Sequence, residues 1–163
     1  MKQVVLAAFA TLVVLFSACE TPTEYTAEAY TINEIVSQPG YSWITTEMGA
    51  YTPNTQYVNQ IKTAYQANPV AFDLFVKPTC TCKGTTKHFP RLLKTLREAG
   101  VPDNAVTIYS MRDVTTKHPA TDKYTIKDLP TFFLTRGTTQ VGNVVATFDE
   151  TVQIDSTVAV ILK

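Results

Sequence analysis

The sequence predicts an α/β fold with a mixed central sheet of about four strands and helices on both of its faces. From Tyr51 onward, segments with helical periodicity alternate with short apolar runs of strand length. Strands separated by helices need crossover connections, which pair them in parallel. The last two apolar runs are joined only by the turn "RGTT" at 136–139, so we expect this final pair to be antiparallel.

The first predicted helix and strand lie next to each other in the chain. Apolar residues recur at helical spacing in 51–69, with Asn54 placed as the N-cap. The run "VAFDLFV" at 70–76 has the length and composition of a strand that is buried on both faces, although Asp73 interrupts it.

A second helix is predicted over 85–100, with Gly100 as its C-cap. Pro90 lies within this segment. It should kink the helix or mark a break in the first turns, because proline removes a backbone hydrogen bond and clashes with the preceding turn. The apolar residues of the segment form one stripe, which consists of Phe89, Leu92, Leu93 and Leu96.

The rest of the chain is predicted as strands, an irregular link and a terminal helix. The link covers 112–128 and contains one helical turn around Ala120 to Tyr124. Apolar patterning places strands at 105–111, 130–135 and 140–148, and a helix within 149–163.

Residues 1–18 have the pattern of an export signal. Lys2 precedes an apolar run that ends at Phe16 and is too short for a bilayer core, which takes about 20 residues in a helix. Ser17 and Ala18 are followed at once by Cys19, so "FSAC" resembles a bacterial lipobox. The resemblance implies cleavage before Cys19 and a lipid on its thiol.

This reading places the protein in the cell envelope, lipid-anchored to a bacterial membrane on the periplasmic side or the cell surface. Residues 19–40 are then a lipidated N-terminus and tether, with a short ordered piece near Ile32 to Val36. Residues 41–163 are expected to form one domain.

Charge and cysteine count narrow the function. The 14 Lys and Arg residues balance the 14 Asp and Glu residues, which gives no electrostatic reason to expect a nucleic acid as partner. We expect a monomer. If Cys19 carries lipid, Cys80 and Cys82 remain of the 3 cysteines. Disulfides persist outside the cytosol, so this count favours a paired, redox-capable centre.

The segment "FVKPTCTCKGTTKHFP" at 75–90 holds the candidate chemistry. Cys82 lies at the N-terminus of the predicted helix, where the helix dipole and backbone N–H groups favour a thiolate. Lys83, Lys87 and His88 add positive charge within about two helical turns. A thiolate in this position would be the nucleophile that thiol–disulfide exchange requires.

From about residue 51 onward the chain resembles the thioredoxin family, above all exported bacterial thioredoxin-like proteins. The matching features are the strand "AFDLFV", Cys82 at a helix mouth, Pro90 in that helix, and "DLPTFFL" before a β-hairpin. In this family the segment matched by Leu129, Pro130 and Thr131 carries a cis proline that faces the active cysteine. The resemblance implies that these three residues bind the substrate segment.

The centre departs from the C-x-x-C of the family. With Cys82 as the first cysteine, Thr85 takes the second position and Cys80 lies upstream in a C-x-C arrangement. The other alignment starts at Cys80 and puts Lys83 in the second position, but the spacing to Pro90 favours Cys82. Two mechanisms stay open: a reversible Cys80–Cys82 disulfide, or Cys82 acting alone with Cys80 assisting.

The sequence therefore predicts a thiol–disulfide oxidoreductase that needs no cofactor and acts on protein thiols or disulfides outside the cytosol. Two other classes compete with it. Cys80 and Cys82, with His88, could bind Cu(I), whereas His118 is expected at the surface. The chain could also be a non-catalytic thioredoxin-fold binding module, because a fold does not fix a function.

Overall fold

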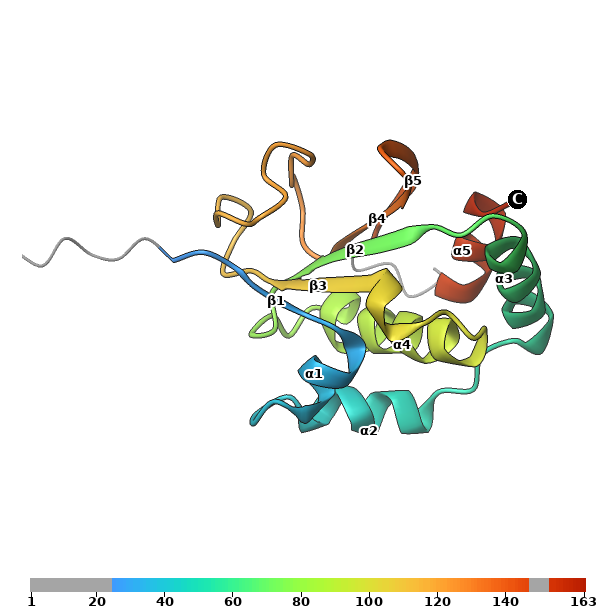
Figure 1. Ribbon diagram of the computed structural model, residues 1–163. Coiled ribbons are helices and arrows are strands. Elements are labelled where there is room, and N and C mark those ends of the chain that lie inside the picture. Colours follow the sequence, from blue (N-terminus) through green and yellow to red (C-terminus); the bar gives the residue numbers. More distant parts are fainter. Residues whose placement is uncertain (1–24, 147–152) are drawn as a thin grey trace, which may run out of the picture.

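The computed structural model describes residues 25–146 and 153–163, which form an α/β fold around one mixed sheet (Figure 1). The predicted signal 1–18 and Cys19 lie outside the described residues. Within the described residues, no helix is long and apolar enough to cross a membrane.

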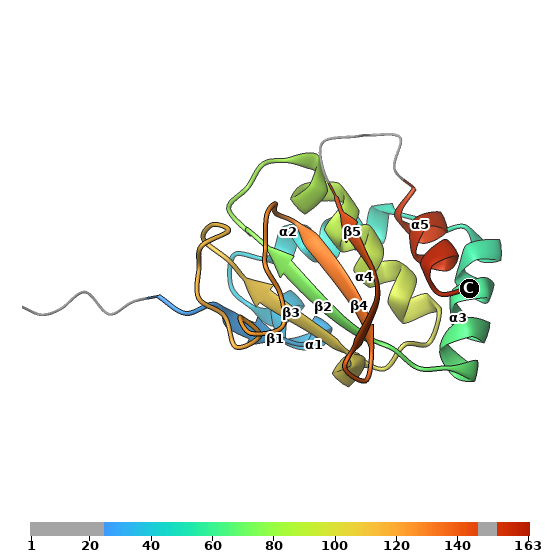
Figure 2. The same cartoon turned by 90° about the horizontal axis from the view of Figure 1, so that it is seen from above.

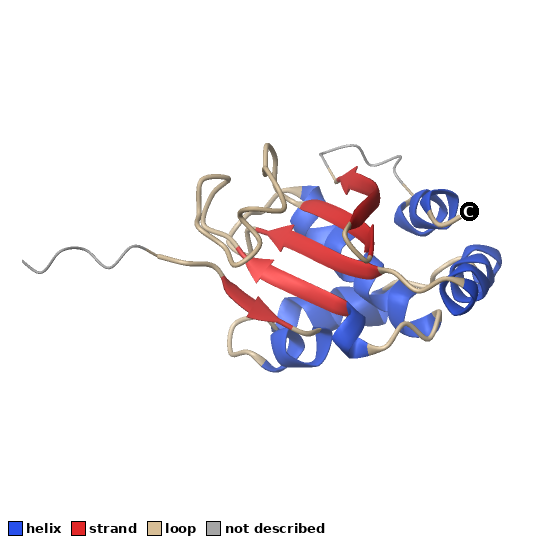
Figure 3. Cartoon of the chain, turned by 45° about the horizontal axis from the view of Figure 1, so that its top comes forward, coloured by secondary structure: helices blue, strands red, loops and turns tan. Residues whose placement is uncertain are grey.

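The sheet has five strands in the order β1-β3-β2-β4-β5 (Figure 3). β2 and β3 pair in parallel, and the other neighbours are antiparallel. The strands are β1 (Glu28–Tyr30), β2 (Ala71–Val76), β3 (Val106–Ser110), β4 (Thr131–Arg136) and β5 (Thr139–Val145). The four predicted strands are confirmed, as are the mixed pairing and the antiparallel final hairpin.

β1 corrects both the strand count and the expected tether. It adds a fifth strand at the edge of the sheet, where its residues pair with β3. The helix that follows, α1 (Ile32–Ser37), buries Ile32 and Ile35 completely, as expected for a short ordered piece in this region. The folded unit therefore includes residues from Tyr25 onward rather than from Tyr41.

Three longer helices follow from sequence signals that the structure makes visible. In α3 (Thr55–Ala67) the N-cap is Asn54, whose side chain accepts a hydrogen bond from the Gln56 backbone N–H at 2.9 Å. After α4 (Phe89–Glu98) the chain turns at Gly100, which has φ +75°, a left-handed conformation that favours glycine. The terminal helix, α5 (Ile154–Ile161), is also confirmed.

One helix was not predicted. α2 (Ser42–Ala50) buries only Ile44 and Met48, so its sequence carries too few core positions for a clear periodicity. A short 3₁₀ helix, η2 (Asp103–Ala105), precedes β3.

The expectation of helices on both faces of the sheet is wrong. In Figure 1, α1, α2 and α4 lie below the sheet, and Figure 2 shows α3 and α5 side by side at one end of it. The buried residues of these five helices belong to one core cluster, together with Phe72, Leu74 and Val76 of β2.

The link between β3 and β4, rather than a helix, covers the other face. Phe75 of β2 alternates to this face and packs in a second cluster with Tyr124 and Ile126 of the link. Residues 120–124 form a hydrogen-bonded turn, in which the Tyr124 N–H donates to the Ala120 carbonyl at 3.0 Å. They do not form a helix.

Asp73, which interrupts the apolar run of β2, fastens the link to this second face. Its carboxylate is buried and accepts hydrogen bonds from Lys123 Nζ at 2.9 Å and from the Tyr124 hydroxyl. A buried carboxylate needs such partners, because burial without them is costly. The polar residue that the strand pattern left unexplained is thus an attachment point for the link.

Candidate functional site

The two cysteines of the C-x-C segment lie together at the C-terminal end of β2. The chain leaves the strand in a turn in which the Cys80 N–H donates to the Lys77 carbonyl at 2.9 Å, and Pro78 follows Lys77. Proline is favoured at this second position of a turn because its φ is already set. The turn was predicted one or two residues later, around Thr79 to Thr81.

The turn brings the sulfur atoms of Cys80 and Cys82 into direct contact, 2.28 Å apart. Their Cα atoms are 5.3 Å apart, which is inside the range of about 4.4–6.8 Å that a disulfide requires. The Cys82 backbone N–H also donates to Cys80 Sγ at 3.1 Å. This backbone can therefore hold both sulfurs as a pair without further movement.

The two sulfurs differ in their access to solvent. Cys82 is 9% exposed, whereas Cys80 is half-buried. Thr85, which is completely buried, places its Oγ1 3.4 Å from Cys82 Sγ. The sequence position that matches the second cysteine of the family is therefore occupied by a hydroxyl beside the buried sulfur.

The helix that follows Cys82 begins with a wide turn. η1 (Gly84–His88) is a π-helix, and it continues directly into α4. Pro90 is the cause that local chemistry supplies, because it has no N–H to donate to the carbonyl four residues earlier. The Phe89 N–H instead donates to the Gly84 carbonyl. The predicted break near Pro90 is confirmed.

The opposite wall of the site comes from the segment before β4. The Leu129–Pro130 peptide bond is cis, as the resemblance implied. Pro130 lies against Gly84: a Cβ at Gly84 would be 2.7 Å from the Pro130 Cδ and 1.9 Å from the Ala146 carbonyl oxygen. Only glycine permits this approach, which puts Pro130 two residues along from Cys82 in the facing element.

The three residues expected to bind substrate are not equivalent. The Pro130 carbonyl already accepts the Ala146 N–H at 3.1 Å. Thr131 is buried and paired within β4, opposite Phe75 and Val145. Leu129 precedes the strand and is half-buried, so it is the member of the three whose backbone lies outside the sheet ladder.

The charges near the centre are mostly basic. Lys83 and Lys87 are exposed on the helix after Cys82, and Lys87 forms an ion pair with Glu47 of α2. His88, in contrast, is buried within the same helix. Glu47 was not singled out in the sequence because α2 itself gave no clear signal.

His118 is buried and not a surface residue, which corrects the sequence expectation. It packs on the second face of the sheet, where its ring centroid lies 4.8 Å from that of Phe75. Burial lowers the pKa of His118. Among the described residues, no three or more His, Cys, Asp or Glu side chains gather in a way that could hold a metal ion. The arrangement thus gives Cys80 and Cys82 no histidine ligand.

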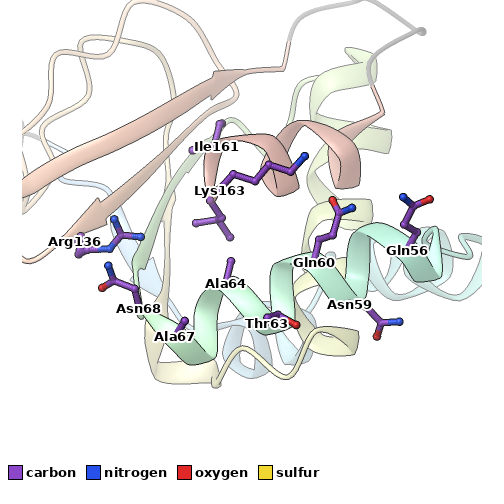
Figure 4. Close-up of a pocket in the computed structure, with 11 residues that line it drawn as sticks. Gln56, Asn59, Gln60, Thr63, Ala64, Ala67, Asn68, Arg136, Ile161 and Lys163 are labelled. Carbon is purple, nitrogen blue, oxygen red and sulfur yellow. The ribbon is translucent and has the colours of Figure 1, made fainter.

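A cavity of about 700 Å³ lies elsewhere, between α3, α5 and Arg136 (Figure 4). Side chains such as Gln60, Asn68 and Lys163 line it, and none of its lining residues comes from the cysteine segment or from 127–131. It is of ligand size, but it does not serve the cysteine pair.

Comparison with known proteins adds no identification: no family model, no curated protein and no solved structure matches the chain.

Proposed function

We propose that this protein is a thiol–disulfide oxidoreductase with a thioredoxin-like fold that works through Cys80 and Cys82. The observation that carries the proposal is the contact between the two sulfurs, in a turn that leads into a helix and faces Pro130. Its substrates are protein thiols or disulfides outside the cytosol, and it acts as a monomer held at a bacterial membrane through lipid on Cys19.

The order of elements supports the thioredoxin-like reading. A strand leads through the cysteine segment into a helix, a parallel strand follows, and a cis proline opens an antiparallel hairpin before a terminal helix. The added β1 and the loop-covered second face are departures from the expected arrangement. Neither departure touches the cysteine segment or Pro130.

The difference in exposure suggests a role for each sulfur. In the oxidised form, a substrate thiolate attacks Cys80 Sγ, the Cys80–Cys82 bond breaks, and Cys82 leaves as a thiolate. A second substrate thiolate then attacks the substrate sulfur of the mixed disulfide and releases Cys80 as a thiolate. The substrate dithiol has lost two electrons and two protons, and the two cysteines, once protonated, have gained them. The reverse sequence reduces a substrate disulfide.

The surroundings of Cys82 fit its role as the leaving and resolving sulfur. The Thr85 hydroxyl can donate a hydrogen bond to a Cys82 thiolate, and the sulfur lies at the start of the continuous helix from Gly84 to Glu98. The positive end of the helix dipole favours a negative charge there. Lys83 adds a positive charge one residue away.

Substrate would lie between the cysteine turn and Leu129. Because the Pro130 carbonyl and Thr131 are engaged within the protein, we assign backbone pairing with the substrate to Leu129. Pro130 would then act as a wall against which the substrate segment rests. No cofactor takes part in this scheme.

Trapping of mixed disulfides tests the assignment of roles. In a Cys19→Ser background, Cys82→Ser should accumulate a mixed disulfide between Cys80 and an added cysteine peptide, seen by mass spectrometry. Cys80→Ser should trap far less peptide, because Cys82 is 9% exposed. Trapping mainly at Cys82 would reverse the roles, and trapping at neither cysteine would contradict exchange.

A further inference from the structure

A basic pocket lies beside the cysteine turn and is not used by the exchange chemistry. It has a volume of about 210 Å³ and is lined by Lys83, Lys87, His88 and Arg91. Cofactor and drug-sized ligands occupy roughly 300–1,000 Å³. The basic pocket is therefore of a size to take one or two side chains of a larger partner.

The cations of the basic pocket are held in place from one side. Glu47 of α2 accepts from Lys87 Nζ and, at 3.2 Å, from Arg91 Nε. Its side chain is only 13% exposed, whereas those of Lys87 and Arg91 are 48% and 34% exposed. One buried carboxylate thus orders two cations that remain accessible, which reduces the entropy lost when an anion binds.

The net charge of the basic pocket is positive. Lys83, Lys87 and Arg91 carry three positive charges against the single negative charge of Glu47. The neighbouring cavity, which shares Arg91, contains Asp155, but this carboxylate is buried and accepts the backbone N–H groups of Asn54 and Ser156. Attraction for an added anion is therefore strongest at the Lys83 and Lys87 end, next to Cys82.

We infer that the basic pocket recognises acidic side chains of a protein substrate, placed close in sequence to the cysteine that reacts with Cys80. This inference rests on the proposed function, since it names the substrate class of the same centre. An Asp or Glu of the substrate would bind Lys83 and Lys87, while the substrate backbone lies along Leu129. Complementary charge of this kind accelerates encounter and selects among partners.

Matched peptides test the inference. Three peptides share one cysteine and differ only in two flanking residues, which are Glu, Gln or Lys. Exchange with the oxidised protein should be about tenfold faster for the Glu peptide than for the Lys peptide at low salt. The difference should shrink at about 0.15 M ionic strength, because salt screens exposed charges.

Variants locate the preference. Lys83→Gln and Lys87→Gln should each reduce the ratio between the Glu and Lys peptides, whereas Lys94→Gln should keep it. Lys94 lies on the same helix but pairs with Glu98 and does not line the basic pocket. Equal rates for all three peptides, or an unchanged ratio in Lys83→Gln and Lys87→Gln, would overturn the inference.

A binding measurement separates this inference from the proposed function. The same peptides with serine in place of cysteine cannot exchange, and fluorescence anisotropy reports their affinity directly. Tighter binding of the Glu peptide that is lost in Lys87→Gln supports recognition of acidic segments, even if exchange fails with every peptide. Exchange with a neutral small dithiol but no charge preference in either assay would retain the proposed function and overturn the inference.

Discussion

Replacing Gly84 with alanine should damage both stability and activity, because Gly84 is the contact between the cysteine helix and the Pro130 segment. A Cβ there would be 1.9 Å from the Ala146 carbonyl oxygen, while ordinary contact begins at 3.4 Å. The two elements would have to separate by about 1.5 Å, the difference between these two distances. Both nearest neighbours, the backbone of Ala146 and the ring of Pro130, are rigid.

Overpacking of this kind costs roughly 1–3 kcal/mol, occasionally more. At about 4 °C per kcal/mol for a domain of this size, the melting temperature should fall by roughly 4–12 °C. Exchange with cysteine peptides should slow as well, since a displacement near 1 Å from productive geometry can cost about 100-fold in rate. Thermal denaturation followed by circular dichroism, and peptide exchange measured below the melting transition, give the two readouts.

Gly49→Ala is the matched control. Gly49 lies within α2, and a Cβ at this position would have nothing within 4 Å. Alanine is the better helix former by roughly 0.5–1 kcal/mol, so this variant should melt at the same temperature or slightly higher. If Gly84→Ala melted and exchanged like the wild type, the close approach between the two elements would be refuted.

Three further changes probe other parts of the account. Thr85→Val keeps the shape of a fully buried side chain but removes the hydroxyl beside Cys82, so alkylation of reduced Cys82 near neutral pH should slow by about tenfold with the melting temperature little changed. Asp73→Ala leaves Lys123 and the Tyr124 hydroxyl without their shared acceptor; it should cost about 1–3 kcal/mol and make the link 112–128 more sensitive to limited proteolysis. Burial lowers the pKa of His118, so below about pH 6.5 the unfolded chain binds a proton that the folded chain resists. Stability should therefore fall as pH drops through this value, and His118→Leu should lose less melting temperature than the wild type between about pH 7.5 and pH 5.

Local signals in the sequence predicted the elements that carry the site. Asn54 and Gly100 mark helix ends because a side-chain cap and a left-handed residue are local requirements. The break before Pro90 follows in the same way from a missing N–H. The approach of the Pro130 segment to Gly84 joins residues far apart in the chain, and only the resemblance to a family pointed to it.

What the sequence did not predict depends on long-range packing. β1 has only 3 residues and owes its conformation to pairing with β3, so no periodicity could reveal it. The second face of the sheet is covered by an irregular link whose attachment to Asp73 has no local signature. His118 looked exposed because its neighbours are polar, but the aromatic ring of Phe75 forms part of its burial site.

The assignment of the reacting sulfur also needed the structure. Spacing in the sequence favoured Cys82 as the attacking cysteine, since it lies at the helix start. The turn at Lys77 to Cys80 leaves Cys80 the more accessible of the two and puts Cys82 beside Thr85. Exposure, which sequence does not encode directly, therefore changes the role proposed for each cysteine.

The central claim is that Cys80 and Cys82 form a reversible redox pair, and mass spectrometry of the purified chain tests it most directly. A Cys19→Ser background removes the third thiol, and metal is removed beforehand. The protein is equilibrated in a series of thiol and disulfide buffers and then alkylated. The account predicts a reversible loss of two hydrogens that links Cys80 to Cys82, with a midpoint that states whether the protein oxidises or reduces its partners. If both thiols were alkylated in every buffer and never paired, the dithiol mechanism would be wrong.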